Sequence, residues 1–343
     1  MKISISSWLS LTTLSFALAL AGCGKENSPE APKAAPAPVA AAAEKTNVRL
    51  QWFDTAQFAG LYVAQDAGLF KNAGLDVEIR SGGPDLNAIT LVTSGSDDFG
   101  IWSADHILIA QSKGVPIVML AAIYREDPNV LMVKEDSRIK TPKDFVGKTV
   151  STVFGRSTET VLNAMLANQG VDKAKVKIVP FPFNIQSFLE GKVDVSAAYI
   201  YDHPYQAQIK GQAVRLINPS DYGVTFYSDC LFARKDFIEK NPELVKKFVQ
   251  ATLAGWQQAL ANKDAAVQST LKRGKGLDAP SQRYMLDKAE PLILAENPGK
   301  IGLINSESIA KMTTTLKAQK LLPETFDPVM SFDNRYVESY FNH

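Results

Sequence analysis

Cysteine and histidine are scarce in this sequence of 343 residues. It contains two cysteines and three histidines, and one of the histidines is the last residue. This scarcity excludes a disulfide-stapled scaffold and a cysteine-rich metal site, and it leaves little for zinc sites built on histidine. An excess of either charge is also lacking, since 37 Lys and Arg residues face 36 Asp and Glu residues. The balance excludes a protein that binds nucleic acid mainly by neutralising phosphates.

Complete motifs of the common enzyme classes are lacking as well. Gly147-Lys148-Thr149 is similar to the end of a phosphate-binding loop, but Pro142 stands where that loop needs its first glycine. Gly155-Arg-Ser157-Thr-Glu159 is similar to a nucleophile elbow, but Glu159 replaces the glycine that the tight turn requires. We therefore expect a protein that is not an enzyme and that holds no cofactor and no metal.

The first 22 residues have the pattern of a signal peptide. Behind Lys2, the uncharged stretch Trp8 to Leu20 is too short to span a membrane, which takes about 20 residues. The following Leu20-Ala-Gly-Cys23 resembles the bacterial lipoprotein signal, in which the cysteine receives lipid such as palmitate. The resemblance implies that Cys23 anchors the protein to a bacterial membrane on its extracytoplasmic side. A plain signal peptide with a chance cysteine is the alternative.

Residues 24–46 are rich in alanine and proline and cannot build a core. We expect residues 23–46 to form an extended, lipidated tether, with the folded body beginning near Asn47. From there, strand and helix patterns alternate, which predicts an α/β fold with a parallel-type sheet between helices. After Pro242 helical patterns dominate. The predicted strands are 48–53, 75–80, 99–102, 116–124, 149–153, 176–180 and 193–199, and the predicted helices are 58–70, 85–93, 104–112, 158–169, 185–189, 242–262, 264–273, 280–296, 306–321 and 333–341.

A short pattern occurs twice. Residues 95–106 and residues 191–203 both run from a glycine to an aspartate three positions later, then through a short apolar strand to an Asp-His pair that opens a helix. The repeat predicts two lobes of similar build. Ligands of open α/β sheets bind where the strands end and the helices begin, so two facing lobes would form a cleft.

Several stretches carry a resemblance to a known family. They include Leu50-Gln-Trp-Phe-Asp-Thr-Ala-Gln-Phe-Ala-Gly-Leu-Tyr62, Gly82-Gly83 and Gly114-Val-Pro116. These stretches resemble transporter substrate-binding proteins for thiamine pyrimidine precursors, which are related to the fungal thiamine-pyrimidine synthases. The wider superfamily also binds alkanesulfonates, taurine and nitrate. The pyrimidine group usually has Pro-Asn and a histidine after the first tryptophan, and Trp52-Phe-Asp54-Thr-Ala-Gln57 departs from this, which leaves the ligand open.

The resemblance implies the solute-binding component of an ABC importer. Its fold would be a two-lobed, type II periplasmic-binding-protein fold with lobe 1 at 47–130, lobe 2 at 131–224, and a return strand and C-terminal helices at 225–343 that complete lobe 1. Two hinge strands near 129–133 and 226–233 would let this monomer close on a small-molecule ligand and then dock on a membrane permease. The alternatives are a binder of alkanesulfonate, taurine, nitrate or a flavin, a lipoprotein that reports to a membrane sensor, and a pyrimidine-synthase-like enzyme. The enzyme is disfavoured because it needs clustered cysteine and histidine, and only Cys230 follows the anchor.

In lobe 1, the candidate ligand contacts follow predicted strands or open helices. Trp52 could stack on a flat ring and Asp54 could accept from a ring amine, or they could be a core residue and a helix N-cap. For the others, core packing or helix capping is the alternative. The candidates are Trp52, Asp54, Tyr62, Ser103, Asp105 and Tyr124.

In lobe 2, free backbone N–H groups at the start of a predicted helix favour an anion or a carbonyl oxygen. Ser157 could instead cap that helix, and Glu159 could interact with its dipole. Aromatic residues outnumber the two nearby arginines, Arg125 and Arg156, which favours a neutral or weakly cationic heteroaromatic ligand over a sulfonate or nitrate. The candidates are Gly155, Ser157, Thr158, Glu159, Phe183, Tyr199, Tyr201 and Asp202.

Overall fold

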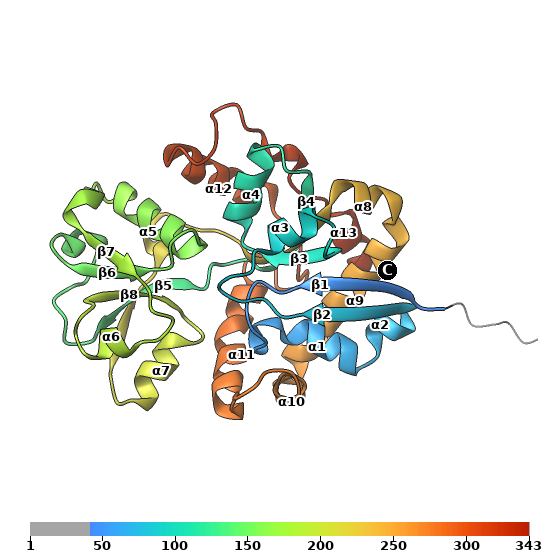
Figure 1. Cartoon of the computed structure of the whole chain (residues 1–343), viewed down its shortest axis with the longest axis horizontal. Helices are drawn as coiled ribbons and strands as arrows, with labels where there is room; N and C mark the ends of the chain where they lie inside the picture. Colours follow the sequence, from blue (N-terminus) through green and yellow to red (C-terminus); the bar gives the residue numbers. More distant parts are fainter. Residues whose placement is uncertain (1–41, 343) are drawn as a thin grey trace, which may run out of the picture. The chain divides into compact units, whose positions relative to one another are not determined.

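The computed structural model describes residues 42–342, which form two five-stranded sheets with helices packed around them (Figure 1). The predicted signal peptide, Cys23 and most of the predicted tether lie outside these residues. The strands are β1 (Glu44–Arg49), β2 (Leu75–Arg80), β3 (Phe99–Trp102), β4 (Ile117–Tyr124), β5 (Asn129–Lys134), β6 (Thr149–Thr152), β7 (Lys177–Pro180), β8 (Val195–Tyr199), β9 (Val214–Ile217) and β10 (Ser228–Arg234).

The two sheets have the same topology. The first has the order β2-β1-β3-β10-β4 and the second the order β7-β6-β8-β5-β9. In each sheet one strand runs antiparallel to its two neighbours, β10 in the first and β5 in the second. Each of these two strands is entered directly after the chain leaves the other sheet. The chain therefore crosses twice between two lobes, as the two-lobed fold class requires.

The repeated sequence pattern forms the same corner in both lobes. The Asp98 carboxylate accepts the N–H of Asn47 on β1 at 3.2 Å, and the Asp194 carboxylate accepts the N–H of Thr149 on β6 at 2.9 Å. Gly95 and Gly191 have φ angles of 81° and 74°, which a glycine adopts without strain. The prediction of two similarly built lobes is confirmed by this correspondence.

The helices surround both sheets, and the C-terminal ones pack on the first (Figure 1). Two further segments, at Gly302 and Phe332, add isolated bridges to β4. The helices are α1 (Ala59–Asp66), α2 (Leu69–Asn72), α3 (Ala88–Thr93), α4 (Ala104–Ser112), α5 (Ser157–Asn168), α6 (Gln186–Leu189), α7 (His203–Ile209), α8 (Lys235–Lys240), α9 (Pro242–Ala261), α10 (Lys263–Leu271), α11 (Ala279–Leu294), α12 (Ser306–Ala318) and α13 (Arg335–Phe341), with short 3₁₀ turns such as η1 (Ala56–Phe58).

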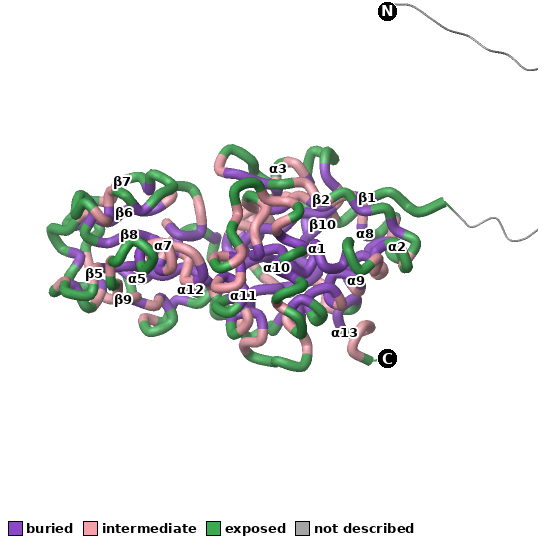
Figure 2. Tube along the Cα trace, turned by 90° about the horizontal axis from the view of Figure 1, so that it is seen from below, coloured by how far each residue is buried: buried purple, intermediate pink, exposed green. Residues whose placement is uncertain are grey.

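The core of lobe 1 lies between its sheet and the helices α1 and α9, where buried residues gather (Figure 2). The two helices meet at two glycines. A Cβ on Gly60 would lie 2.3 Å from Cγ of Trp256, and a Cβ on Gly255 would lie 2.2 Å from the Gly60 carbonyl oxygen. Only glycine therefore allows this close approach, which brings α1 and the turn before it into a fixed position.

The structure differs from the predicted elements at the start of the body. β1 begins at Glu44, within the range predicted as tether, because residues 44–49 pair in register with β2. It ends at Arg49, whereas the predicted first strand continued to residue 53. Residues 50–55 form an irregular turn instead, and this turn carries Trp52 toward the other lobe. The predicted lobe boundary at residue 130 falls inside β5.

Candidate ligand-binding site

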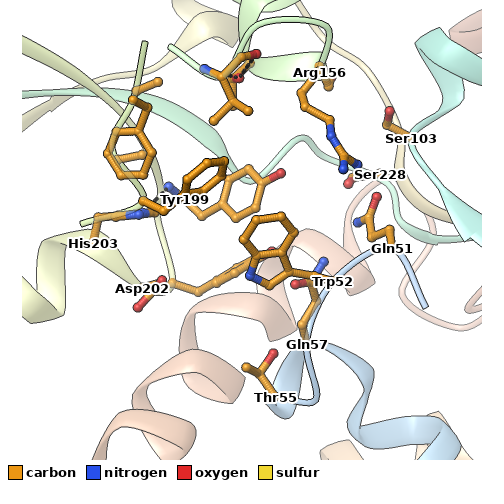
Figure 3. Close-up of a pocket in the computed structure, with 18 of the residues that line it drawn as sticks. Gln51, Trp52, Thr55, Gln57, Ser103, Arg156, Tyr199, Asp202, His203 and Ser228 are labelled. Carbon is orange, nitrogen blue, oxygen red and sulfur yellow. Dashed lines mark hydrogen bonds between the residues drawn. The ribbon is translucent and has the colours of Figure 1, made fainter. Parts of the chain in front are cut away.

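A cavity of about 160 Å³ lies between the two lobes (Figure 3). Its walls come from the turns after β1, β3, β6, β7 and β8, so it lies at the carboxyl ends of the parallel strands of both sheets. This is the edge at which open α/β sheets bind ligands. The start of β10 and one residue of α11 complete it. The lining residues are Gln51, Trp52, Thr55, Gln57, Trp102, Ser103, Val153, Arg156, Ser157, Thr158, Phe181, Phe183, Ala197, Ala198, Tyr199, Tyr201, Asp202, His203, Gln206, Ser228 and Met285.

One side of the cavity is aromatic. Trp52 of lobe 1 stacks on Phe183 of lobe 2, with ring centroids 5.7 Å apart and ring planes inclined by 29°. Phe183 has a φ of 56°, a conformation that costs energy for a residue with a side chain, and its side chain is half exposed. Tyr199 lies beside Trp52 in Figure 3. Flat ligands gain from such stacking surfaces.

Three hydroxyl groups of the lining are buried without a hydrogen-bond partner in the described part of the chain. They belong to Thr55, Ser157 and Tyr201. Buried polar atoms nearly always have a partner, so these three are available to a ligand or to water. Burial raises the pKa of the Tyr201 hydroxyl well above its usual range, and the group is therefore a neutral donor at neutral pH.

Arg156 connects the two lobes. Its Nη2 donates to the carbonyl oxygens of Gly83, Pro84 and Leu86 in lobe 1, at 3.2, 2.8 and 3.3 Å. Its guanidinium carbon lies 4.5 Å from the centre of the Trp102 ring, a cation–π contact. Desolvation lowers the pKa of Arg156, while Tyr199 and Asp85 favour its charge.

His203 closes the aromatic side as a neutral group. Burial lowers its pKa below the ordinary 6.5, although Asp202 favours its charge. Its Nδ1 accepts the backbone N–H of Tyr199 at 3.0 Å, so the ring proton is placed on Nε2. The ring meets Phe181 edge-on at 5.2 Å. Asp202 accepts from Gln206 at 2.8 Å.

Buried carboxyl groups lie at both crossings. Asp229, at the start of β10, accepts from Nε2 of Gln57 at 2.9 and 3.1 Å and from Ser228 at 3.2 Å. Asp127, just before β5, accepts from the backbone and side chain of Asn129. Burial raises the pKa of each carboxyl to about 7. Gln57 is thus held in the cavity wall by a residue of the second crossing.

The structure brings eight of the fourteen predicted site residues to the cavity. Their contact with a ligand remains a prediction. They are Trp52, Ser103, Ser157, Thr158, Phe183, Tyr199, Tyr201 and Asp202.

The other six, which are Asp54, Tyr62, Asp105, Tyr124, Gly155 and Glu159, do not line the cavity and have local partners or deep burial instead. Asp54 accepts from the Tyr62 hydroxyl at 2.9 Å and also from Ser81. Asp105 is fully buried in the first turn of α4. Asp54 and Asp105 therefore lie outside the cavity lining, and their contact with a ligand stays a prediction.

Tyr124, Gly155 and Glu159 also lie outside the cavity lining, and each has a partner within its own lobe. The Tyr124 hydroxyl donates to the Gln57 carbonyl at 3.2 Å inside the lobe 1 core. The Glu159 carboxylate accepts the N–H of Gly155 at 2.9 Å, which closes the turn before α5 on itself. Arg125 is also outside the cavity, because it donates to the carbonyls of Ile293 and Asn297.

Thirteen lining residues were not predicted as contacts. Arg156 and His203 had a sequence signal, one as an arginine in the turn and the other as part of the repeat. Ser228 and Met285 had none, because only tertiary structure brings them to the cavity. The remaining ones are Gln51, Thr55, Gln57, Trp102, Val153, Phe181, Ala197, Ala198 and Gln206.

Two further properties of the described residues concern metal binding and membrane crossing. Among residues 42–342, no three His, Cys, Asp or Glu side chains are grouped to hold a metal ion. No helix in the same part of the chain has the length and apolar character needed to cross a bilayer.

The fold and cleft define a two-lobed ligand-binding protein of the periplasmic-binding-protein class. Among solved structures, the aliphatic sulphonate binding protein SsuA from Escherichia coli matches with a TM-score of 0.68 and 20% identity, over 84% of this chain and 91% of that one. The family described as NMT1/THI5 like matches residues 55–266. The chain belongs to this family, which confirms the superfamily resemblance seen in the sequence.

Curated relatives include binding proteins and enzymes. A formylaminopyrimidine-binding protein of Halalkalibacterium halodurans is 28% identical over 85% of this chain and 89% of its own length. A riboflavin-binding protein, RibY, of Chloroflexus aurantiacus is 28% identical over 90% of both chains. A 4-amino-5-hydroxymethyl-2-methylpyrimidine phosphate synthase of Legionella pneumophila is 22% identical over 85% of this chain and 92% of its own.

Proposed function

We propose that this protein is the extracytoplasmic solute-binding component of an ABC importer and that it captures a small heteroaromatic ligand of the thiamine-pyrimidine-precursor kind. The observation that carries the proposal is the aromatic slot at the lobe interface, where Trp52 faces Phe183 beside Tyr199. A flat ring that enters between Trp52 and Phe183 would contact both lobes at once. The similarity to a formylaminopyrimidine-binding protein supports this ligand class.

Cavity size favours one ring over a larger ring system. Its volume is about 160 Å³. An apolar protein cavity of about 150 Å³ binds benzene, so a single substituted ring fits this conformation of the cleft. A three-ring flavin, the ligand class named for the relative RibY, requires the lobes to be further apart.

Binding without turnover is the activity that the site chemistry favours. Cys230 is fully buried in β10 outside the cavity lining, and burial raises the pKa of its thiol, which makes it a poor nucleophile. His203 has one nitrogen engaged with the backbone. A ligand that bridges both lobes would shift the population toward a closed form, hinged at the two crossings, and that form would dock on a membrane permease. Lipid attachment at Cys23 would keep the protein near that permease.

The test is a thermal-shift screen of residues 42–343, which form a compact unit. The probes are a formylaminopyrimidine, 4-amino-5-hydroxymethyl-2-methylpyrimidine, riboflavin, taurine and nitrate. Ligand binding stabilises by about 2.7 kcal/mol at a hundredfold excess over Kd, so a pyrimidine should raise the melting temperature clearly. Mass spectrometry of the recovered probe should show it unchanged. A shift with taurine or nitrate alone, or conversion of a probe, would overturn the proposal.

A further inference from the structure

The cavity has a second, polar side opposite its aromatic side. Figure 3 places the guanidinium of Arg156 near Gln51, Ser103 and Ser228, whereas His203 and Asp202 lie on the far side of Trp52. Ser103 and Ser228 are buried, with 6% and 5% of their surface exposed. This end of the cavity therefore combines a cation, an amide and two hydroxyl groups in a confined space.

Arg156 brings unused hydrogen-bonding capacity to this end. All the hydrogen bonds that its side chain donates within residues 42–342 come from Nη2 and go to carbonyl oxygens, not to carboxylates. A guanidinium has five N–H donors, so those of Nε and Nη1 remain for another partner. A half-buried charge that is left with neutral acceptors is costly when the site closes, and an acceptor oxygen on a ligand would reduce that cost.

The start of α5 provides independent support. Ser157 is the first residue of this twelve-residue helix and lines the cavity, and its hydroxyl is buried without a partner in the described part of the chain. The N–H groups of a first helical turn favour an acceptor oxygen as well. Both Arg156 and Ser157 therefore present donors to the same cavity.

We propose that this polar end, formed by Arg156, Ser157, Gln51, Ser103 and Ser228, makes the site select flat single-ring ligands whose substituent ends in an acceptor oxygen, either the carbonyl of an acylamino group or an acid oxygen. The ring occupies the aromatic side and the oxygen occupies the polar end, where a carbonyl or acid oxygen is a stronger acceptor for a guanidinium than the oxygen of a hydroxyl group. The inference rests on the proposed function, because it assumes that the ring binds against Trp52.

Three probes with the same kind of ring separate the possibilities. A formylaminopyrimidine has a carbonyl, 4-amino-5-hydroxymethyl-2-methylpyrimidine phosphate has acid oxygens, and 4-amino-5-hydroxymethyl-2-methylpyrimidine has only a hydroxyl. Titration calorimetry on the full chain in mild detergent should give, for at least one of the first two, a Kd about 10–100-fold lower than for the third, as expected of a charge-assisted hydrogen bond. Which of the two binds tighter identifies the carbonyl or the acid oxygen as the partner.

The variant Arg156→Gln tests the residue itself. It also removes bonds to Gly83 and Pro84, so it is expected to weaken the binding of all three probes. The measured quantity is therefore a ratio, the Kd of 4-amino-5-hydroxymethyl-2-methylpyrimidine divided by the Kd of whichever of the other two probes binds tighter. That ratio should fall to about 1–3 in Arg156→Gln. Arg234→Gln is the matched control, because Arg234 also stacks on an aromatic ring and donates to a carbonyl, that of Val92, outside the cavity. It should leave the ratio unchanged.

The outcomes are distinguishable. If none of the three pyrimidines binds the wild-type chain, the proposed function fails and this inference fails with it. If all three bind with similar Kd values, or if Arg156→Gln keeps the wild-type ratio, the proposed function stands and the selective role of the polar end is wrong. Arg156→Lys gives a second variant should the glutamine variant fold poorly, and it should retain part of the preference for an acid oxygen.

Discussion

The two lobes share one topology but differ in what supports them and in what they present to the cleft. Lobe 1 has its sheet backed by α9 and α11 and extended by bridges to β4. Lobe 2 has the same strand order without those additions. The turns after β1 and β3 in lobe 1 face the cavity, and so do the turns after the corresponding strands β6 and β8 in lobe 2. The shared topology therefore determines where the site is, while the residues of the corresponding turns determine its chemistry.

The corresponding turns differ in how firmly they are held. In lobe 1, the Ala56 N–H donates to Gln282 of α11 at 2.8 Å, and Gln57 is bonded to Asp229. In lobe 2, Phe183 is half exposed with a left-handed backbone, and it contacts the other lobe through Trp52. We infer that lobe 1 provides a fixed wall and lobe 2 the adjustable one.

The largest expected effect comes from disturbing the support of lobe 1. In Gly60→Ala, the new methyl group would overlap the Trp256 ring at 2.3 Å, and we expect a loss of about 3 kcal/mol of unfolding free energy. In lobe 2, Gly211→Ala meets no atom within 4 Å and should lose about 1 kcal/mol through its positive φ alone. Denaturant unfolding measures both. Equal losses would mean that α9 does not constrain α1 in this way.

The next largest effect is expected on ligand affinity, when the aromatic residue of each lobe is removed in turn. Trp52→Ala should raise the Kd of a formylaminopyrimidine about 10–100-fold, because it removes the larger, half-buried stacking surface. Phe183→Ala should raise it only about 3–10-fold, because that ring is half exposed. Calorimetry gives the two values, and the melting temperature without ligand serves as the control. A large loss of stability in Trp52→Ala without ligand would identify Trp52 as a core residue instead.

The buried carboxyl groups at the two crossings predict that the stability of the fold depends on pH. Asp127 and Asp229 have pKa values near 7 in the folded chain because burial disfavours their charge, against the ordinary 3.8 in the unfolded chain. Below pH 3.8 both states are protonated and neither group lowers stability. As the pH rises from 3.8 toward 7, the unfolded chain releases these protons while the folded chain still holds them, so the free energy of unfolding falls.

Asp127→Asn should therefore be more stable than the wild type at pH 8, by about 1–3 kcal/mol, and nearly equal to it at pH 4. Melting curves at the two pH values measure this difference. Asp136→Asn, at an exposed position in the same lobe, is the control and should follow the wild type at both. A variant that is equally stable or less stable at pH 8 would contradict the burial argument.

The smallest effects are expected from surface ion pairs. Asp66 of lobe 1 is partly buried, which opposes its charge, but hydrogen bonds from Arg273 and Lys272 outweigh this and hold its pKa well below its usual range. Asp66→Asn should lose about 0.5 kcal/mol at pH 7, and the loss should shrink as the pH falls. Glu190→Gln in lobe 2 breaks an exposed pair with Lys192 and should leave the melting temperature unchanged. Equal losses in both would show that the lobes do not differ here.

Local patterns predicted most of the fold. The periodicity of strands and helices and the repeated aspartates gave both sheets and the edge at which the cavity lies, because these features depend on residues close in sequence. The end of the first strand was misplaced, since the alternation continues through Trp52 while Gly82 N–H bonds to the Trp52 carbonyl in a turn. Asp54 was assigned to the site for the same reason.

Other residues predicted for the site lie outside the cavity lining because contacts between distant segments hold them elsewhere. Tyr62 is paired with Asp54 and Tyr124 with Gln57 inside lobe 1, which no local pattern reveals. The reach of Arg156 across the cleft depends on how the two lobes face each other. Met285 comes from α11, and only tertiary packing brings it to the cavity.

The position of α11 has a consequence for when the protein can bind. This helix supplies Met285 to the cavity and Gln282 to the turn before α1, and its last turn accepts from Arg125 at the first crossing. The cavity is therefore complete only after residues 279–294 have been synthesised. A chain that ends before α11 lacks this side of the cavity, the partner of the Ala56 N–H and the acceptor for Arg125.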